Sequence, residues 1–158
     1  MPHLGAAYNL ARWLLRDPSD AEDVVQESYL RAFRFFGGYR GGDSRAWLLK
    51  IVRNTAYTWL QQNRSVEFAE FLDDEIEAIE GDALDPETLV IQTASVEALR
   101  KALDELPIEF REIVILREFE DLSYKEIAGI AEIPIGTVMS RLARARKRLQ
   151  EQLGKFMN

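Results

Sequence analysis

Residues 122–149, LSYKEIAGIAEIPIGTVMSRLARARKRL, predict two short helices joined by a tight turn. Ser123 is placed to cap the first helix, and Glu126 three residues later completes a capping box. The turn is expected at residues 131–134. The second helix carries an apolar face at helical spacing, formed by Val138, Leu142, Ala145 and Leu149. This pattern predicts a helix-turn-helix, whose second helix enters the major groove of DNA.

The second predicted helix supplies both kinds of contact that DNA binding needs. Its cations can neutralise phosphates, and they are Arg141, Arg144, Arg146, Lys147 and Arg148. Ser140 and Arg144 are better placed for base edges. The alternative is a solvated, arginine-rich helix face, and the capping and turn pattern favours the DNA-binding interpretation.

The composition of the 158 residues excludes several classes of protein. There is no cysteine, so disulfides and thiolate zinc sites are impossible, and the lone His3 is expected to be incidental. The acidic group Asp20, Glu22 and Asp23 is explained by helix capping and the helix dipole. No supporting nucleophile or glycine-rich phosphate loop accompanies these carboxylates, so we expect no enzyme, no metal and no cofactor. Without a membrane-length apolar run or a signal peptide, the chain is expected to be cytoplasmic, with no membrane insertion.

The net charge of −7 conceals an uneven distribution of charge along the chain. Residues 1–64 hold 9 basic and 6 acidic side chains, residues 65–99 hold 11 acidic and no basic ones, and residues 100–158 hold 11 basic and 10 acidic ones. A local positive patch, and not the global charge, governs attraction to phosphates. The net negative charge therefore does not exclude a nucleic-acid partner.

Residues 1–64 are expected to form the first of two small helical domains. An apolar run at residues 4–15 predicts one helix, and the break at Asp17 and Pro18 precedes a second that Ser19 should cap, with Glu22 in the reciprocal position. The glycine-rich turn at residues 37–43 ends that helix, and a third should start near Ser44.

The third predicted helix places aromatic, basic and amide side chains broadly on one side. They are Trp47, Lys50, Arg53, Asn54 and Tyr57. Such a mixture suits unstacked bases, because aromatic rings stack on bases while cations contact the backbone. The alternative is that Trp47 belongs to the core, where tryptophan at helical spacing is more often found.

Residues 65–95 are predicted to be an acidic linker, and residues 96–158 the second domain, so the chain is expected to be all-α. The linker is only a weak candidate for a calcium loop, because it lacks the alternating ligands and central glycine of an EF-hand. The second domain should restart at Pro107 as a helix reaching Phe119, after an earlier helix that Asp85 and Pro86 begin.

Two blocks of sequence carry a resemblance to the sigma factors of bacterial RNA polymerase, sigma-70 family, in the compact extracytoplasmic-function (ECF) group. DAEDVVQESYLRAF, residues 20–33, resembles the region-two helix that docks on the clamp of the largest subunit, and RAWLLKIVRNTAYTWL, residues 45–60, resembles the part that engages and opens the minus-ten element. Residues 106–149 resemble region four, which reads the minus-thirty-five element.

The resemblance implies a division of roles among the residues. Core RNA polymerase would be faced by Asp23, Gln26, Glu27 and Arg31. Asn54, with the loop 37–43, would help to hold a flipped base of the minus-ten element, within a set of Trp47, Lys50, Arg53, Asn54 and Tyr57. The minus-thirty-five element would be contacted by Thr137, Ser140, Arg141, Ala143, Arg144, Arg146, Lys147 and Arg148. The family also implies promoter DNA and an anti-sigma factor as partners, and promoter opening without ATP or catalysis.

The chain departs from the family pattern in three places. Further residues usually precede the position of Pro2, so the resemblance implies that the first region-two helix is missing or shortened. Met139 stands where the family often has a cation, and Glu132 stands at a turn position where glycine is frequent. If Glu132 adopts a positive φ, the conformational cost is about 1 kcal/mol.

Two other classes of protein compete with a sigma factor. A helix-turn-helix regulator that binds operator DNA without replacing sigma would explain residues 122–149, but it has no reason to carry the docking and melting helices at residues 20–60. An antagonist that mimics sigma would not need the arginines of the last helix.

Overall fold

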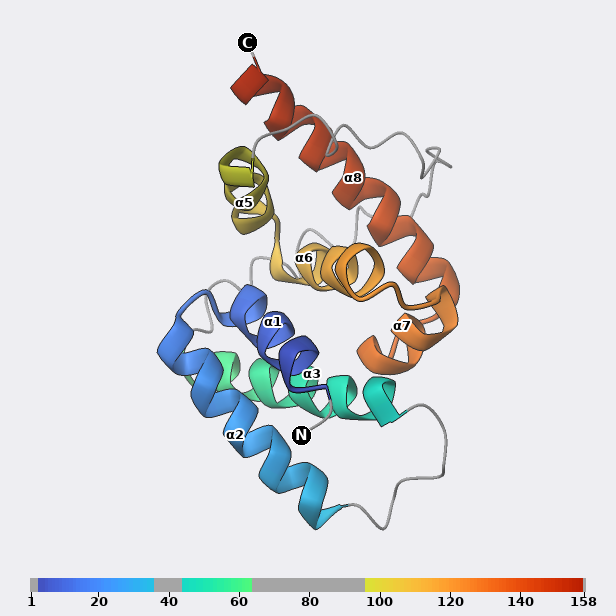
Figure 1. Cartoon of the computed structure of the whole chain (residues 1–158). Coiled ribbons are helices and arrows are strands. Elements are labelled where there is room, and N and C mark those ends of the chain that lie inside the picture. Colours follow the sequence, from blue (N-terminus) through green and yellow to red (C-terminus); the bar gives the residue numbers. More distant parts are fainter. Residues whose placement is uncertain (1–2, 36–43, 64–95, 158) are drawn as a thin grey trace.

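The computed structural model describes residues 3–35, 44–63 and 96–157, with side chains described as far as Gly154. Within these ranges every regular element is a helix (Figure 1). The helices in chain order are α1 (Leu4–Leu15), α2 (Pro18–Arg34), α3 (Ser44–Asn63), α5 (Val96–Glu105), α6 (Ile108–Val114), the π-helix η3 (Ile115–Phe119), α7 (Tyr124–Ala131) and α8 (Ile135–Met157). The all-α prediction is confirmed. The predicted linker, the turn at 37–43 and the helix start at Asp85 and Pro86 lie outside the described residues.

Helices α1, α2 and α3 form an N-terminal bundle in which each packs on the other two. Its core is apolar, with fully buried side chains from all three helices that include Leu10, Leu14, Val24, Leu49 and Val52. The predicted helix at residues 4–15 and the predicted start near Ser44 are both confirmed.

The start of α2 corrects one prediction. The capping residue is Asp17, not Ser19: its carboxylate accepts hydrogen bonds from the backbone N–H groups of Ser19, at 2.8 Å, and Asp20, at 3.2 Å. Pro18 explains the difference, because its fixed φ and missing N–H favour the first helical position, which makes Asp17, two residues before Ser19, the cap.

Helices α5 to α8, with η3, form a C-terminal bundle in which the long α8 packs on α5, α6 and α7. The helix-turn-helix prediction is confirmed. Ser123 accepts from the backbone of Glu126 at 3.1 Å and the Glu126 carboxylate accepts from the backbone of Ser123 at 2.9 Å, which completes the capping box of α7. Glu132 ends α7 with a φ of 59°, in the left-handed conformation that the sequence position suggested.

The helix expected from Pro107 to Phe119 changes character halfway. Residues Ile108–Val114 are α-helical, and Ile115–Phe119 form a π-helical turn that ends before Asp121, whose φ is 54°. The wider turn accommodates one more residue than an α-helix and ends at Phe119, which lies against Trp13 of α1.

The two bundles pack directly against each other. Figure 1 shows α1 and α3 lying beside α6 and α7, and contacts join α3 to α7 and α1 to both α6 and η3. The rings of Trp13 and Phe119 meet edge to face with centroids 6.2 Å apart. Among the described helices, none is long and apolar enough to cross a membrane.

Candidate nucleic-acid and partner interfaces

The exposed side of α8 carries part of the predicted minus-thirty-five set. Lys147 and Arg148 are exposed, and Thr137, Ala143 and Arg144 are half-buried. Ser140 is half-buried, and its hydroxyl donates to the Gly136 carbonyl at 3.0 Å, a contact within its own helix that leaves the oxygen able to accept. Beside this set Met139 is 51% exposed.

Two arginines of the predicted set point into the protein. Arg141 is buried and donates to a carboxylate oxygen of Glu109 at 3.0 Å, and burial lowers the pKa of its guanidinium. Arg146 is also buried and pairs with Glu118. Arg141 therefore joins α8 to α6, and Arg146 joins α8 to η3. The accessible cations of the predicted set are Arg144, Lys147 and Arg148.

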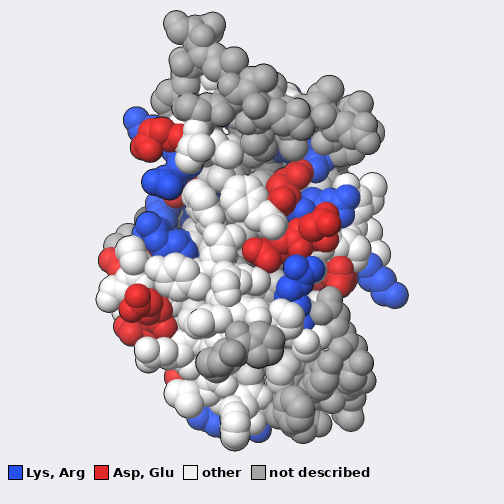
Figure 2. Space-filling model, in the orientation of Figure 1, with Lys and Arg blue, Asp and Glu red and all other residues white. Residues whose placement is uncertain are grey.

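The surface shows no uniform basic patch from the side drawn in Figure 2. There, basic and acidic side chains lie next to one another across the C-terminal bundle.

The predicted minus-ten residues of α3 lie at the boundary between the two bundles. Arg53 Nε donates to Glu112 Oε1 at 2.6 Å, and the hydroxyl of Tyr57 donates to Glu112 Oε2 at 2.7 Å. Burial lowers the pKa of Arg53, but the Glu112 carboxylate more than offsets this and the net pKa is raised. Burial, reinforced by the Glu112 carboxylate, raises the pKa of Tyr57, so this hydroxyl stays protonated and can donate. The Arg53 guanidinium also lies 3.9 Å from the centroid of the Tyr57 ring.

The other two basic residues of α3 also contact the C-terminal bundle. Lys50 Nζ lies 3.4 Å from a carboxylate oxygen of Glu132, and Arg45 Nη1 lies 3.9 Å from one of Glu120. These pairs are more exposed than Arg53 with Glu112, so solvent weakens them.

Trp47 and Asn54 complete the predicted minus-ten set. Trp47 is half-buried and packs on the core, so both interpretations of this residue retain support. Asn54 is half-buried, and its side-chain oxygen accepts from Arg53 at 3.3 Å.

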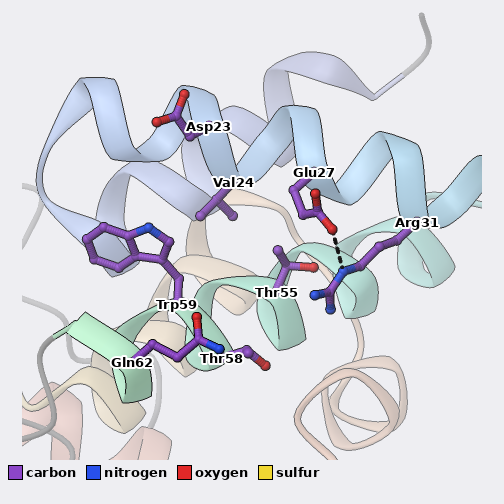
Figure 3. Close-up of a pocket in the computed structure, with 8 residues that line it drawn as sticks. All are labelled: Asp23, Val24, Glu27, Arg31, Thr55, Thr58, Trp59 and Gln62. Atoms are coloured by element: carbon purple, nitrogen blue, oxygen red, sulfur yellow. Dashed lines mark hydrogen bonds and ion pairs between the residues drawn. The ribbon is translucent and has the colours of Figure 1, made fainter.

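A pocket between α2 and α3 brings together three of the four residues predicted to face core polymerase. Asp23, Glu27 and Arg31 line it from α2, and Arg31 pairs with Glu27 at 3.0 Å (Figure 3). Its volume is about 320 Å³. The fourth residue, Gln26, is exposed on α2 but does not line the pocket.

The opposite wall of the pocket was not predicted from the sequence. It comes from α3 and consists of Thr55, Thr58, Trp59 and Gln62. Figure 3 shows Trp59 and Gln62 near the end of α3, with Thr55 lying across from Glu27. Their helical spacing on the side of α3 away from Arg53 was the available signal.

Two large apolar side chains of α2 that do not line the pocket are exposed. Leu30 is 61% exposed and Phe33 is 87% exposed, so both side chains offer apolar area to a partner. In the described ranges, no group of three or more His, Cys, Asp or Glu side chains is placed to bind an ion.

Comparisons with known proteins match both bundles. The family described as sigma-70 region 2 matches residues 1–66, and sigma-70 region 4 matches residues 96–149. The ECF RNA polymerase sigma factor SigE of Mycolicibacterium smegmatis is 33% identical over 97% of this chain, which spans 59% of that relative's length. The RNA polymerase sigma-H factor of Pseudomonas aeruginosa is 34% identical, over 88% of this chain and 76% of the relative.

A solved structure is similar over both bundles together. The sigma factor RpoE of Bartonella quintana, in a complex with the anti-sigma factor NepR, matches with a TM-score of 0.72 and 33% identity over 96% of this chain and 91% of that one. Two sigma regions match in the expected order, and the relatives are similar over most of the chain. The chain therefore belongs to the ECF group of the sigma-70 family of RNA polymerase sigma factors.

Proposed function

We propose that this chain binds core RNA polymerase and directs it to promoters that it recognises at a minus-thirty-five and a minus-ten element. The observation that carries the proposal is the presence of both sigma regions, at residues 1–66 and 96–149, on one chain. A regulator that only binds operator DNA would need the helix-turn-helix and not the first region. The chain would act in the cytoplasm and without catalysis of its own.

We assign minus-thirty-five reading to the exposed side of α8. Ser140, Ala143 and Arg144 would face base edges, and Lys147 and Arg148 would neutralise phosphates, which suits their exposure. Thr137 lies in the first turn of the same helix. Arg141 and Arg146 were predicted to contact phosphates as well. Their ion pairs with Glu109 and Glu118 support a second role, which is to orient α8.

Minus-ten reading is assigned to the face of α3 that carries Trp47, Lys50, Arg53, Asn54 and Tyr57. A single-stranded segment needs stacking surfaces and cations together, and this face offers two aromatic rings and two cations beside an amide. A flipped base would lose a few kcal/mol of stacking on extrusion, so a pocket that accepts it both melts the duplex and selects sequence. The division of the chain into domains 1–64 and 96–158, joined by the linker 65–95, belongs to the same proposal.

Core polymerase would dock on α2 and the pocket beside it. The exposed carboxylate of Asp23 suits a basic side chain of a partner, while Leu30 and Phe33 suit an apolar one. Gln26, Glu27 and Arg31 would add hydrogen bonds at the rim of this surface. An anti-sigma factor is a further expected partner, supported by the similarity of both bundles to a sigma factor captured in such a complex.

Run-off transcription tests the proposal. Purified chain added to sigma-free core polymerase should yield transcripts from a subset of a promoter library, and core alone should yield none. Phe33→Asp should weaken core binding in a pull-down, because it places a charge in the apolar part of the docking surface, whereas Ser19→Asp, exposed at the start of α2, is the matched control. A chain that binds operator DNA but not core would refute the proposal.

A further inference from the structure

The start of α8 carries exposed apolar side chains that take no part in the polar contacts assigned to this helix. Ile135 is 45% exposed and Met139 is 51% exposed. Because they are four residues apart, they lie next to each other on one face of the helix. No other large apolar side chain is exposed in the part of α8 whose side chains the structure describes. Exposed apolar area in that part of α8 is thus confined to the start of the helix.

The packing of α8 fixes the direction in which Met139 points. Val138 has no exposed area, and its backbone N–H donates to the Pro134 carbonyl at 3.1 Å within the first turn of the helix. Met139 follows Val138 by about 100° around the helix axis, which turns it away from the core. A Cβ added at the neighbouring Gly136 would meet no atom within 4 Å, so the space beside Met139 is open.

Met139 lies among the residues assigned to base edges. Ser140 directly follows it, Ala143 lies one turn later on the same face, and Arg144 comes next after Ala143. In a helix-turn-helix, the N-terminal residues of the second helix contact base edges in the major groove. DNA that meets Ser140 and Arg144 therefore also meets Met139. The exposed apolar face is continuous with the proposed minus-thirty-five interface, so we take duplex DNA as its occupant.

The chemistry of methionine restricts what Met139 can recognise in the groove. Its side chain has no hydrogen-bond donor, and its thioether sulfur is only a weak acceptor. The apolar group that a base pair presents in the major groove is the C5-methyl group of thymine. Against an amino or carbonyl group, methionine would displace water without replacing the hydrogen bonds of that water, which is unfavourable. Its unbranched, flexible side chain can adapt its shape to a methyl group.

We propose that Met139, supported by Ile135 one turn earlier, selects thymine at one base pair of the minus-thirty-five element by contacting the C5-methyl group. This inference rests on the proposed function, because it takes α8 as the helix that reads this element. Burial of one methyl group favours binding about fourfold, so thymine is preferred at that position over a base without the methyl group by about this factor. Ser140 and Arg144 specify neighbouring base pairs through hydrogen bonds.

Uracil tests the contact, because it differs from thymine only in lacking the C5-methyl group. The chain is combined with core polymerase, and its preferred minus-thirty-five sequence is selected from a promoter library. Each thymine of that sequence, on either strand, is then replaced singly by uracil. At one position the replacement should weaken promoter binding about fourfold. With Met139→Ala the same replacement should have no effect, and the thymine promoter should already bind as weakly as the uracil promoter binds the natural chain.

Two further variants separate reading by Met139 from a general loss of apolar surface. Val96→Ala truncates an apolar side chain that is 75% exposed on α5, and it should retain the full effect of uracil. Met139→Gln keeps the length of the side chain but presents an amide. A selection repeated with this variant should lose the preference for thymine at the one base pair and keep the preferences at the others.

The inference and the proposed function fail in different ways. A selected sequence without an A·T pair, or without sensitivity to uracil at any position, overturns reading by Met139 even where run-off transcription succeeds. An effect of uracil that persists in Met139→Ala also overturns it. Weaker binding of core polymerase by Met139→Ala, with the effect of uracil retained, would assign this face to a protein partner instead. Absence of run-off transcripts from every promoter overturns the proposed function and this inference with it.

Discussion

The buried guanidinium of Arg111 joins α1 to the C-terminal bundle. This residue has no exposed area; its Nε donates to the Trp13 carbonyl at 2.7 Å and its Nη1 to the Leu106 carbonyl at 2.8 Å. Longer bonds of 3.4 Å reach the carbonyls of Leu14 and Asp104. One side chain therefore satisfies carbonyls in the last turn of α1 together with those of Asp104, near the end of α5, and Leu106, in the turn that follows.

Arg111→Met keeps much of the apolar stem and removes every one of these donors. Each hydrogen bond from a charged donor contributes about 1.5–3 kcal/mol, so the two short ones together contribute about 3–6 kcal/mol. Relief of the buried charge offsets part of this. We expect the free energy of unfolding to fall by about 3–4 kcal/mol. Arg111→Lys should lose about half as much, because a single ammonium is less able to reach both carbonyls.

Urea titration followed by circular dichroism and tryptophan fluorescence measures this loss. The control is Arg100→Met, which changes the same residue type at an exposed position of α5 and should cost less than about 0.5 kcal/mol. A loss in Arg111→Met no larger than that of the control would refute the argument that these hydrogen bonds stabilise the chain. Equal stability of Arg111→Lys and the natural chain would refute the geometric part of it.

Three further outcomes are expected. Burial and, as a smaller cause, repulsion from Glu112 raise the pKa of Glu109 to about 7, above its value in the unfolded chain. The protonated form therefore stabilises the folded chain, and this stabilisation is lost as the pH rises through about 7. The melting temperature should therefore fall as the pH rises from about 4.5 to about 7, and Glu109→Gln should reduce that fall. Ser123→Ala removes the cap of α7 and should lower the free energy of unfolding in urea by about 1 kcal/mol. The control is Ser19→Ala, which removes a serine that does not cap its helix. Arg144→Ala should change minus-thirty-five preference in a promoter library, whereas Arg148→Ala should weaken binding evenly and reduce its salt dependence; similar behaviour of the two would contradict the assigned roles.

Local signals in the sequence predicted the helices well. The capping box of Ser123 and Glu126 and the apolar face of α8 depend on residues only a few positions apart, and both are present in the structure. The error at Ser19 was also local. Asp17 and Ser19 could each cap a helix start, and Pro18 between them decided in favour of Asp17.

The partners of the arginines could not be predicted in the same way. Arg141 and Arg146 resemble phosphate contacts in the sequence, but their carboxylates, Glu109 and Glu118, lie in a preceding helical segment. Such pairings depend on how helices pack and leave no periodic signal. The spacing of Arg141 three residues after the buried Val138 was the one local indication that it faces inward.

The contact between bundles was likewise beyond the sequence. Each bundle carries its own pattern of apolar residues, and nothing in either pattern indicates that Arg53 and Tyr57 meet Glu112. Three α2 residues of the pocket were predicted, as residues that face core polymerase, but Trp59 on the α3 side was missed. A pocket wall depends on how two helices pack together, which the pattern of either helix alone does not indicate.

Ion pairs form part of the contact between the two bundles, and they have a consequence for solubility. Lys50 with Glu132, and Arg53 with Glu112, would regain hydration if the bundles separated, whereas an apolar contact would expose adhesive surface. The contact also has an apolar part, since the rings of Trp13 and Phe119 meet and buried apolar side chains of both bundles belong to one core cluster. The ion pairs therefore limit, without removing, the apolar surface that separation of the two halves would expose.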